Sequence, residues 1–284
     1  MSLDFWRQPS GFSDAASQAA LLRDLPREPA ALAKVVQGLM IHEHMPDMYG
    51  VAFDAARHGE AHVRPVEGVL QGIAQHDRRP LVEARAPGER QVGVCRHFTL
   101  LHVAMLRGQG VPARARCGFG GYFETGKYFD HWVTEYWDAG KSRWILLDPQ
   151  VDERQRAAFK ITIDTLDVPR DQFLVAGDAW VLCRAGKEDP ANFGILDMHG
   201  LWFIASNVIR DLAALNNREM LPWDGWGAMV KGDENVDTAL IDRLATLTHD
   251  PDAHFEALRA AYRDPRLAVP ATVFNHVLNR AEAA

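Results

Sequence analysis

Cysteine, excess positive charge and long apolar runs are all scarce in this chain of 284 residues. The three cysteines, Cys95, Cys117 and Cys183, are too few and too scattered for a disulfide framework, so a reducing compartment is the simpler expectation. Acidic residues outnumber basic ones by 38 to 31, which argues against a dedicated binder of nucleic acid or of an anionic membrane.

No stretch of the sequence reaches the length of uninterrupted apolar residues that a membrane span needs. The most apolar window, residues 201–215, contains Asn207, Arg210 and Asp211. The first residues show no basic region followed by an apolar run, so we expect no secretory signal and a cytoplasmic protein. With 47% apolar and 24% charged residues, the composition is that of a globular protein with one large domain or two small ones.

The periodicity of apolar residues divides the chain into three predicted regions: a helical region over residues 1–64, a core over 65–185 and a C-terminal helical region over 186–284 that packs on the core. Helices are predicted over 30–45, 66–76, 95–107, 201–215, 236–247, 252–262 and 271–281, and strands over 113–117, 131–137 and 143–147. A helix followed by an antiparallel meander predicts an α+β fold, with helices added at both ends.

Cys95 lies at the predicted first turn of the helix over 95–107. Unpaired N–H groups of a first turn carry partial positive charge, which favours a thiolate over a thiol, and the neighbouring Arg96 adds to that charge. The thiolate is the nucleophilic form, so the position suits a nucleophile. Taken alone, Cys95 is better interpreted as a small buried apolar residue than as a nucleophile.

His131 begins one predicted strand and Asp148 ends the next. If the intervening turn is centred on Ala139 and Gly140, the hairpin register places the two residues directly opposite each other, where a carboxylate can orient an imidazole. The alternatives are a strand-edge histidine without a role and an Asx-turn of Asp148 before Pro149. A five-residue loop would break this register.

Four segments of the sequence resemble the transglutaminase-like superfamily, relatives of the papain-like cysteine proteases. They follow one another in order between about residues 65 and 152: Gly93-Val94-Cys95, Leu106-Arg107-Gly108-Gln109-Gly110-Val111-Pro112-Ala113-Arg114, Asp130-His131-Trp132-Val133-Thr134-Glu135 and Trp144-Ile145-Leu146-Leu147-Asp148-Pro149. The resemblance implies a papain-like core in which Cys95 is the nucleophile, His131 the general base and acid, and Asp148 the residue that orients it. Family members form a thioester with an amide or peptide carbonyl, which water or an amine then resolves.

The residues around Cys95 supply candidates for binding the substrate. The backbone N–H of Cys95 is one oxyanion donor, and Gln91 is either a second donor or a solvated loop residue. Family members often carry an acidic residue two positions after the cysteine, where this chain has His97. Arg96 and His97 either contact a polar or anionic substrate group or simply cap and solvate the helix.

The remaining motifs favour structural interpretations. The run from Gly121 to Tyr128 nearly matches a phosphate-binding loop, but it lacks the Ser or Thr that binds magnesium and strand signals follow it. The pairs His58/His62 and His42/His44 are interpreted as solvated, so no metal site is expected. Cys117 and Cys183 lie in apolar segments with the sequence pattern of strands, so both are expected to be buried. Residues 118–123 are expected to form an aromatic loop.

The sequence therefore predicts a cytoplasmic, cysteine-dependent acyl-transfer enzyme that needs no cofactor. We expect it to hydrolyse an amide or peptide bond in a peptide, a protein or a small amide. The alternatives are transamidation, as in protein-glutamine gamma-glutamyltransferases, and a non-catalytic binding module on the same fold. A metal hydrolase would rest on the scattered histidines alone, and the oligomeric state is not predicted.

Overall fold

The computed structural model describes residues 2–284, which form two compact units. The first unit comprises the chain up to Ala115 together with Val133–Val168, and the second comprises Arg116–Trp132 and Pro169–Ala284. The chain passes from the first unit to the second within strand β3 (Ala113–Gly120) and returns within strand β4 (Tyr128–Asp138). The region boundaries at residues 64 and 185 remain predictions from the sequence.

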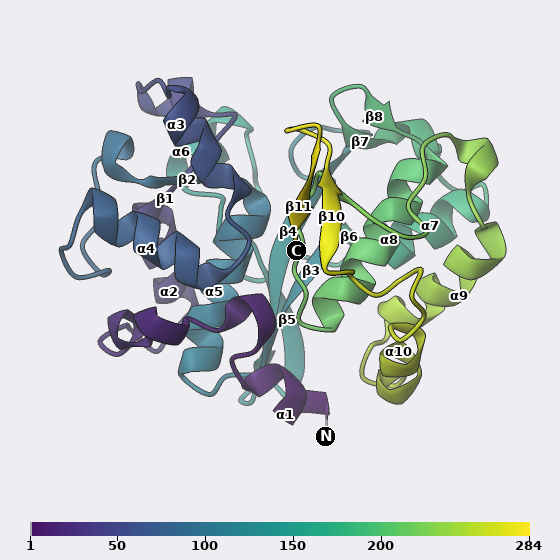
Figure 1. The fold of residues 1–284 in the computed structure, drawn as a ribbon, viewed down its shortest axis with the longest axis horizontal. Helices are drawn as coiled ribbons and strands as arrows, with labels where there is room; N and C mark the ends of the chain where they lie inside the picture. The colour runs from purple at the N-terminus through teal and green to yellow at the C-terminus, as the bar shows by residue number, and fades with distance from the viewer. Residues whose placement is uncertain (1) are drawn as a thin grey trace. The chain divides into compact units, whose positions relative to one another are not determined.

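Helix α5 (Cys95–Gly108) is the central element of the first unit, and its side chains are buried from Cys95 to Arg107. Helices α2 (Pro29–Leu39) and α4 (Val66–His76) pack against it, as Figure 1 shows. The unit also contains α1 (Ser2–Arg7), α3 (Ala55–Gly59), α6 (Glu153–Ala158), β1 (Met40–His42), β2 (Gln91–Gly93) and β5 (Arg143–Leu147). The helices predicted over 66–76 and 95–107 are confirmed.

The helix predicted over residues 30–45 is wrong at its C-terminal end. Helix α2 stops at Leu39, and Met40–His42 form strand β1, which pairs in parallel with β2. Pairing with a segment about fifty residues away, in a buried position, overrides the helical spacing of the local sequence. Because β2 is followed almost immediately by α5, this pairing holds the segment that leads into the helix.

The main sheet has the strand order β6-β3-β4-β7-β8, and β5 also pairs with β4. Its short strands are β6 (Phe173–Val175), β7 (Phe193–Ile195) and β8 (Met198–His199). All three predicted strands are confirmed, and β5 has the predicted bounds. However, β4 pairs antiparallel with β5 and parallel with β7, so the sheet is mixed rather than antiparallel as expected.

Three helices pack together in the second unit: α7 (Ala176–Arg184), α8 (Leu201–Leu215) and α9 (Thr238–His249) (Figure 1). The unit also contains α10 (Phe255–Ala261) and a small sheet of β9 (Asp224–Gly225), β10 (Thr272–Asn275) and β11 (Arg280–Ala283). With both helical layers and a largely antiparallel sheet, the fold is α+β.

Two predictions for the second unit are wrong. Residues 271–281 do not form a helix but most of the β10–β11 hairpin, in which the Asn275 side chain accepts the N–H groups of Val277 and Leu278 and so closes the turn. Cys183 lies on helix α7 rather than in a strand. Among residues 2–284, no helix has both the length and the hydrophobicity that crossing a bilayer requires.

Candidate active site

Cys95 is the first residue of α5, as the sequence predicted, and its side chain is 7% exposed. Strand β2 leads into it through Gly93, where the chain passes close to two other elements. A Cβ atom at position 93 would lie 2.8 Å from both the Cβ of His97 and the Cε of Met40. Only glycine fits between these atoms without displacing them, so Gly93 fixes how the chain enters the helix that begins at Cys95.

His97 caps this helix start. Its Nδ1 atom accepts the backbone N–H of Val94 at 3.1 Å, and its Nε2 atom donates to the carbonyl of Val63 at 2.9 Å. Burial, together with the charge of Arg96, lowers the pKa of His97 to about 3, so the ring is neutral. Both ring nitrogens are engaged in structural hydrogen bonds, which supports the capping interpretation of His97 over substrate contact.

Arg96 and Gln91 are buried, so the interpretation of either as a solvated residue is wrong. The Arg96 guanidinium lies over the ring of Phe12, 5.7 Å from its centroid. Gln91 belongs to β2, and its amide lies against Gly72 of α4, where an added Cβ would come within 2.0 Å of its Oε1 atom. The predicted roles of both residues in substrate binding stay predictions.

A buried hydrogen bond ties the helix that begins at Cys95 to the sheet. The Nδ1 atom of His102, on α5, lies 3.0 Å from the Oγ1 atom of Thr134, on β4. The Nε2 atom of the same ring donates to the carbonyl of Pro29 at 3.0 Å. Because a carbonyl only accepts, Nδ1 is unprotonated and accepts the threonine hydroxyl. Burial lowers the pKa of His102 to about 4 and keeps the ring neutral.

The hairpin register differs from the prediction by two residues. Thr134 pairs with Leu147 and Asp138 with Arg143, so the turn is centred between Gly140 and Lys141. An unbroken register would therefore place Asp148 opposite Val133, not directly opposite His131 as expected. His131 and Val133 lie on the same face of β4, because side chains alternate along a strand.

The side chain of Asp138 sets this register. Its Oδ1 atom accepts the N–H groups of Gly140 at 2.8 Å and Lys141 at 3.0 Å. Ser142 completes the four-residue loop in the left-handed region, with φ of 49°. The prediction placed the turn one residue too early because it took Ala139 and Gly140 as its centre.

Asp148 is fully buried directly after β5. Its Oδ1 atom accepts the N–H of Gln150 at 2.9 Å and that of Val151 at 3.4 Å, so the Asx-turn anticipated before Pro149 is present. Its own N–H donates to the carbonyl of Thr165 at 2.8 Å. These bonds hold the carboxylate in a fixed position at the end of the strand.

A chain of hydrogen bonds that the sequence did not reveal supports the turn at Asp148. Gln150 donates from Nε2 to Oε1 of Gln155 at 3.0 Å, and Gln155 donates from Nε2 to the hydroxyl of Tyr49 at 3.0 Å. The Tyr49 hydroxyl donates to Oδ2 of Asp152 at 2.8 Å. Since Tyr49 lies about a hundred residues from its partners in the sequence, no local pattern indicated this link.

His131 belongs to the second unit and is 3% exposed. Its ring meets three aromatic rings edge to face, with centroids 5.0 Å from Phe123, 6.2 Å from Tyr122 and 6.4 Å from Phe173. The predicted aromatic loop is therefore partly right: residues 118–120 extend β3, whereas Tyr122 and Phe123 contact the candidate base. This apolar contact restricts how the imidazole can turn.

Asp130, the residue before His131, takes part in a second hydrogen-bond network that the sequence did not predict. Asp130 accepts a hydrogen bond from Nδ2 of Asn207 at 2.8 Å, and Asn207 accepts one from Arg210 at 3.0 Å. Burial raises the pKa of Asp130, while the Arg210 charge opposes that rise. Neighbouring residues of a strand point to opposite faces, so this network holds β4 from the face opposite the His131 ring.

The other cysteines and the histidine pairs do not form a competing site. Cys117 is fully buried, and burial raises the pKa of Cys183 to about 12. His42 is buried in β1 rather than solvated, and His58 contacts Glu43. Within the described chain, residues 2–284, no group of three or more His, Cys, Asp or Glu side chains is arranged to hold a metal ion.

Comparison with known proteins identifies one family. Residues 55–149, which include every candidate site residue, match the model of the transglutaminase-like superfamily. A crystal structure of a "putative cysteine protease" from Cytophaga hutchinsonii is similar to this chain, with 14% sequence identity and a TM-score of 0.32 over 60% of this chain and 44% of that one. The match thus spans less than half of that protein. No curated protein matches the chain.

Proposed function

Because residues 55–149 match the model of the transglutaminase-like superfamily, we propose that this protein catalyses acyl transfer from an amide or peptide bond through a thioester on Cys95. The observation that carries the proposal is the His102–Thr134 hydrogen bond. It joins the helix that starts at Cys95 to strand β4, which contains His131 three residues before Thr134. Thr134 in turn pairs with Leu147, the residue before Asp148.

The proposed reaction has two stages, with the same groups reversing roles between them. His131 removes the thiol proton of Cys95 as the sulfur attacks the carbonyl carbon, and it returns that proton to the leaving amine when the C–N bond breaks. His131 then removes a proton from water, whose oxygen attacks the thioester. The C–S bond breaks, the acid leaves, and the proton returns to the sulfur.

The neighbouring groups have supporting roles in this proposal. Asp148 orients the imidazole and stabilises it when protonated, which suits a carboxylate fixed by its own Asx-turn. The backbone N–H of Cys95 donates to the developing oxyanion, and Gln91 is the candidate for a second donor. Residues Tyr122 and Phe123 confine the His131 ring, which reduces the freedom it loses on reaching the reactive orientation.

We propose hydrolysis in preference to transamidation, because no feature of the described residues marks a site for an acceptor amine, whereas water is always present. The substrate is proposed to be a peptide, a protein or a small amide. A non-catalytic binding module would not require a cysteine, a histidine and an aspartate to occupy the three positions together, so the retention of all three favours the enzyme.

The test compares the wild-type protein with Cys95→Ala and Cys95→Ser on a panel of peptide, isopeptide and small amide substrates, with and without added amine. We expect the wild type to hydrolyse at least one substrate, and both variants to do so at a rate lower by about a thousandfold or more. The matched control is Cys183→Ala, which removes a buried thiol elsewhere and should retain activity. Turnover that survives in Cys95→Ala would refute the assignment, and a product that incorporates the amine would favour transamidation.

A further inference from the structure

The first unit has a basic pocket whose lining contains none of the candidate site residues. It has a volume of about 480 Å³. Its lining includes Lys34 of helix α2, Tyr49, and Arg90 just before strand β2. Asp152 and Arg154, at the start of helix α6, also line it. None of the residues assigned to nucleophile, base or oxyanion lines it. The proposed acyl transfer leaves this pocket without a role.

The fold brings two like charges together in this pocket. The guanidinium groups of Arg90 and Arg154 both lie over the ring of Tyr49, 5.7 Å and 5.9 Å from its centroid. Burial lowers the pKa of Arg90, and the Arg154 charge lowers it further, whereas the nearby Tyr49 and Asp152 oppose that shift. Two cations that repel each other across one aromatic ring form a place where an anion would relieve the repulsion.

Most donors of these cations are unused within residues 2–284. Arg90 donates from Nε to the carbonyl of Arg85 at 3.0 Å, and Arg154 donates one N–H to the carbonyl of Met48 at 3.3 Å. The remaining guanidinium N–H groups and the Lys34 ammonium have no hydrogen bond or ion pair within that range. Guanidinium groups with free parallel N–H donors match the oxygens of a carboxylate or a phosphate.

The acidic residues of the pocket do not neutralise these cations fully. Both carboxylate oxygens of Asp152 are already engaged, Oδ1 with the N–H of Gln155 and Oδ2 with the hydroxyl of Tyr49. Glu153 is exposed and forms no ion pair within residues 2–284. Three cations against two carboxylates leave the pocket with a net positive charge.

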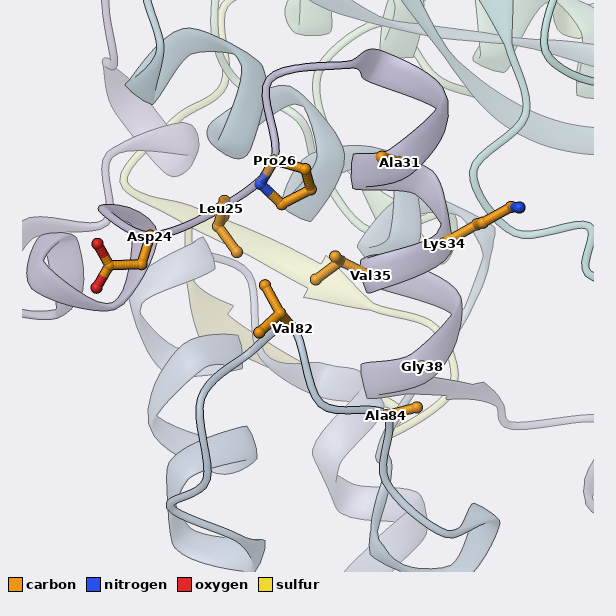
Figure 2. A pocket seen from close by; sticks show the side chains of 9 residues that line it. All are labelled: Asp24, Leu25, Pro26, Ala31, Lys34, Val35, Gly38, Val82 and Ala84. Carbon is orange, nitrogen blue, oxygen red and sulfur yellow. The ribbon is translucent and has the colours of Figure 1, made fainter.

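An apolar groove adjoins the basic pocket and shares Lys34 and Gly38 with it. Figure 2 shows that Leu25, Val35 and Val82 point toward one another along this groove, whereas the Lys34 side chain points away from them. Val82 is 50% exposed, which is unusual for a large apolar side chain next to others of its kind. The two hollows together offer a cationic end and an apolar surface.

We propose that the basic pocket and the adjoining groove bind a small amphipathic anion, with its carboxylate or phosphate at Arg90 and Arg154 and its apolar chain against Val35 and Val82. The charge distribution selects the anionic end, and the open apolar surface selects the chain. This site does not depend on the acyl-transfer proposal, because it uses none of the residues assigned to nucleophile, base or oxyanion, although Tyr49 and Asp152 of its lining also support the turn at Asp148.

The test measures ligand binding to the full chain by titration calorimetry and by the shift in unfolding temperature, at constant ionic strength because salt screens such contacts. Octanoate and octyl phosphate are the probes, acetate and inorganic phosphate are the matched anions without a chain, and octanol is the uncharged control. We expect octanoate or octyl phosphate to bind about tenfold or more tightly than acetate or inorganic phosphate. The stronger of the two probes identifies the anionic group.

Three variants locate the site. Arg154→Gln should weaken the binding of octanoate and octyl phosphate about tenfold, and Arg90→Gln should do the same if it folds. Val82→Ser should weaken the binding of both without changing the response to acetate. Arg263→Gln, which removes an exposed charge elsewhere, should leave binding unchanged. Equal binding by Arg154→Gln and Arg263→Gln would overturn the proposal. So would self-association of the protein with no response to any of the probes.

Discussion

The imidazole of His102 accepts a hydrogen bond from the hydroxyl of Thr134 across 3.0 Å in the interior of the first unit. The bond joins the midpoint of α5 to the middle of β4. Cys95 is the first residue of this helix, and Asp148 follows the second strand of the hairpin that β4 forms with β5. The bond therefore helps to fix the distance between Cys95 and that hairpin. A single neutral histidine thus sets the spacing between two elements of the candidate site.

This histidine makes stability depend on pH in a defined window. The pKa of His102 is about 4 in the folded chain, against about 6.5 in an unfolded one, so the unfolded chain binds more protons between these values. The free energy of unfolding therefore falls as the pH drops from 6.5 toward 4, by up to about 1.4 kcal/mol per pH unit. His97, whose pKa is about 3, acts in the same direction.

Urea unfolding at pH 7, 6 and 5 checks this dependence. In His102→Gln, which cannot titrate, the decline should be shallower than in the wild type, although stability at pH 7 should be lower by about 1–3 kcal/mol because buried partners lose their bonds. His199→Gln, an exposed histidine, should behave like the wild type. An unchanged slope in His102→Gln would contradict the assignment of a neutral buried ring.

Tyr49→Phe tests the hydrogen-bond chain behind Asp148. The change removes one hydroxyl that bonds both Gln155 and Asp152, so it should cost about 1 kcal/mol of stability and loosen the turn that holds Asp148. If Asp148 orients the catalytic base, kcat should fall several-fold with little change in KM. The control is Tyr262→Phe, which removes a hydroxyl bonded to Val269 and should leave kcat unchanged.

Gly93→Ala tests the close approach before the nucleophile. The added methyl would meet His97 and Met40 at 2.8 Å, so we expect a loss of about 1–3 kcal/mol in stability and a loss of activity larger than the stability change explains. Gly59→Ala is the matched control, because nothing lies within 4 Å of a Cβ there. Equal effects of the two substitutions would show that the packing at Gly93 does not matter.

Alkylation by iodoacetamide under native conditions should select Cys95. Cys117 is fully buried, and the pKa of Cys183 is raised to about 12, so neither should react appreciably at neutral pH. Mass spectrometry of the digested protein gives the labelling of each residue. Similar labelling of all three cysteines would count against an activated thiol.

Local pattern was enough to predict the elements whose stability is local or strongly amphipathic. Strand β5 and helices α4 and α8 have the bounds that the sequence indicates, and Cys95 starts its helix as expected. Cys95 and His131 were therefore placed on the right elements, whereas Gln91 lies in strand β2 rather than in a solvated loop. Their positions along those elements follow from short-range spacing, which a sequence displays directly.

Positions that depend on distant partners were not predictable. The turn of the β4–β5 hairpin lies one residue later than predicted, because the Asp138 side chain accepts two backbone N–H groups there. Met40, which was predicted to be helical, instead pairs with β2. The β10–β11 hairpin has apolar residues at positions that also suit a helix, and only the turn formed by Asn275 distinguishes the two. Tyr49 contacts the loop after Asp148 across a long stretch of sequence.

The route of the chain through β3 and β4 means that the two units are not consecutive along it. A ribosome completes the first unit only after it has made residues 116–132, the opening piece of the second. Cleavage after Val168 would leave His131 attached to the N-terminal fragment, while the C-terminal fragment would lack the strand segments that it packs with. Neither half can therefore be expressed alone as an intact unit by a single truncation, and split versions of this protein would have to regain function by fragment complementation.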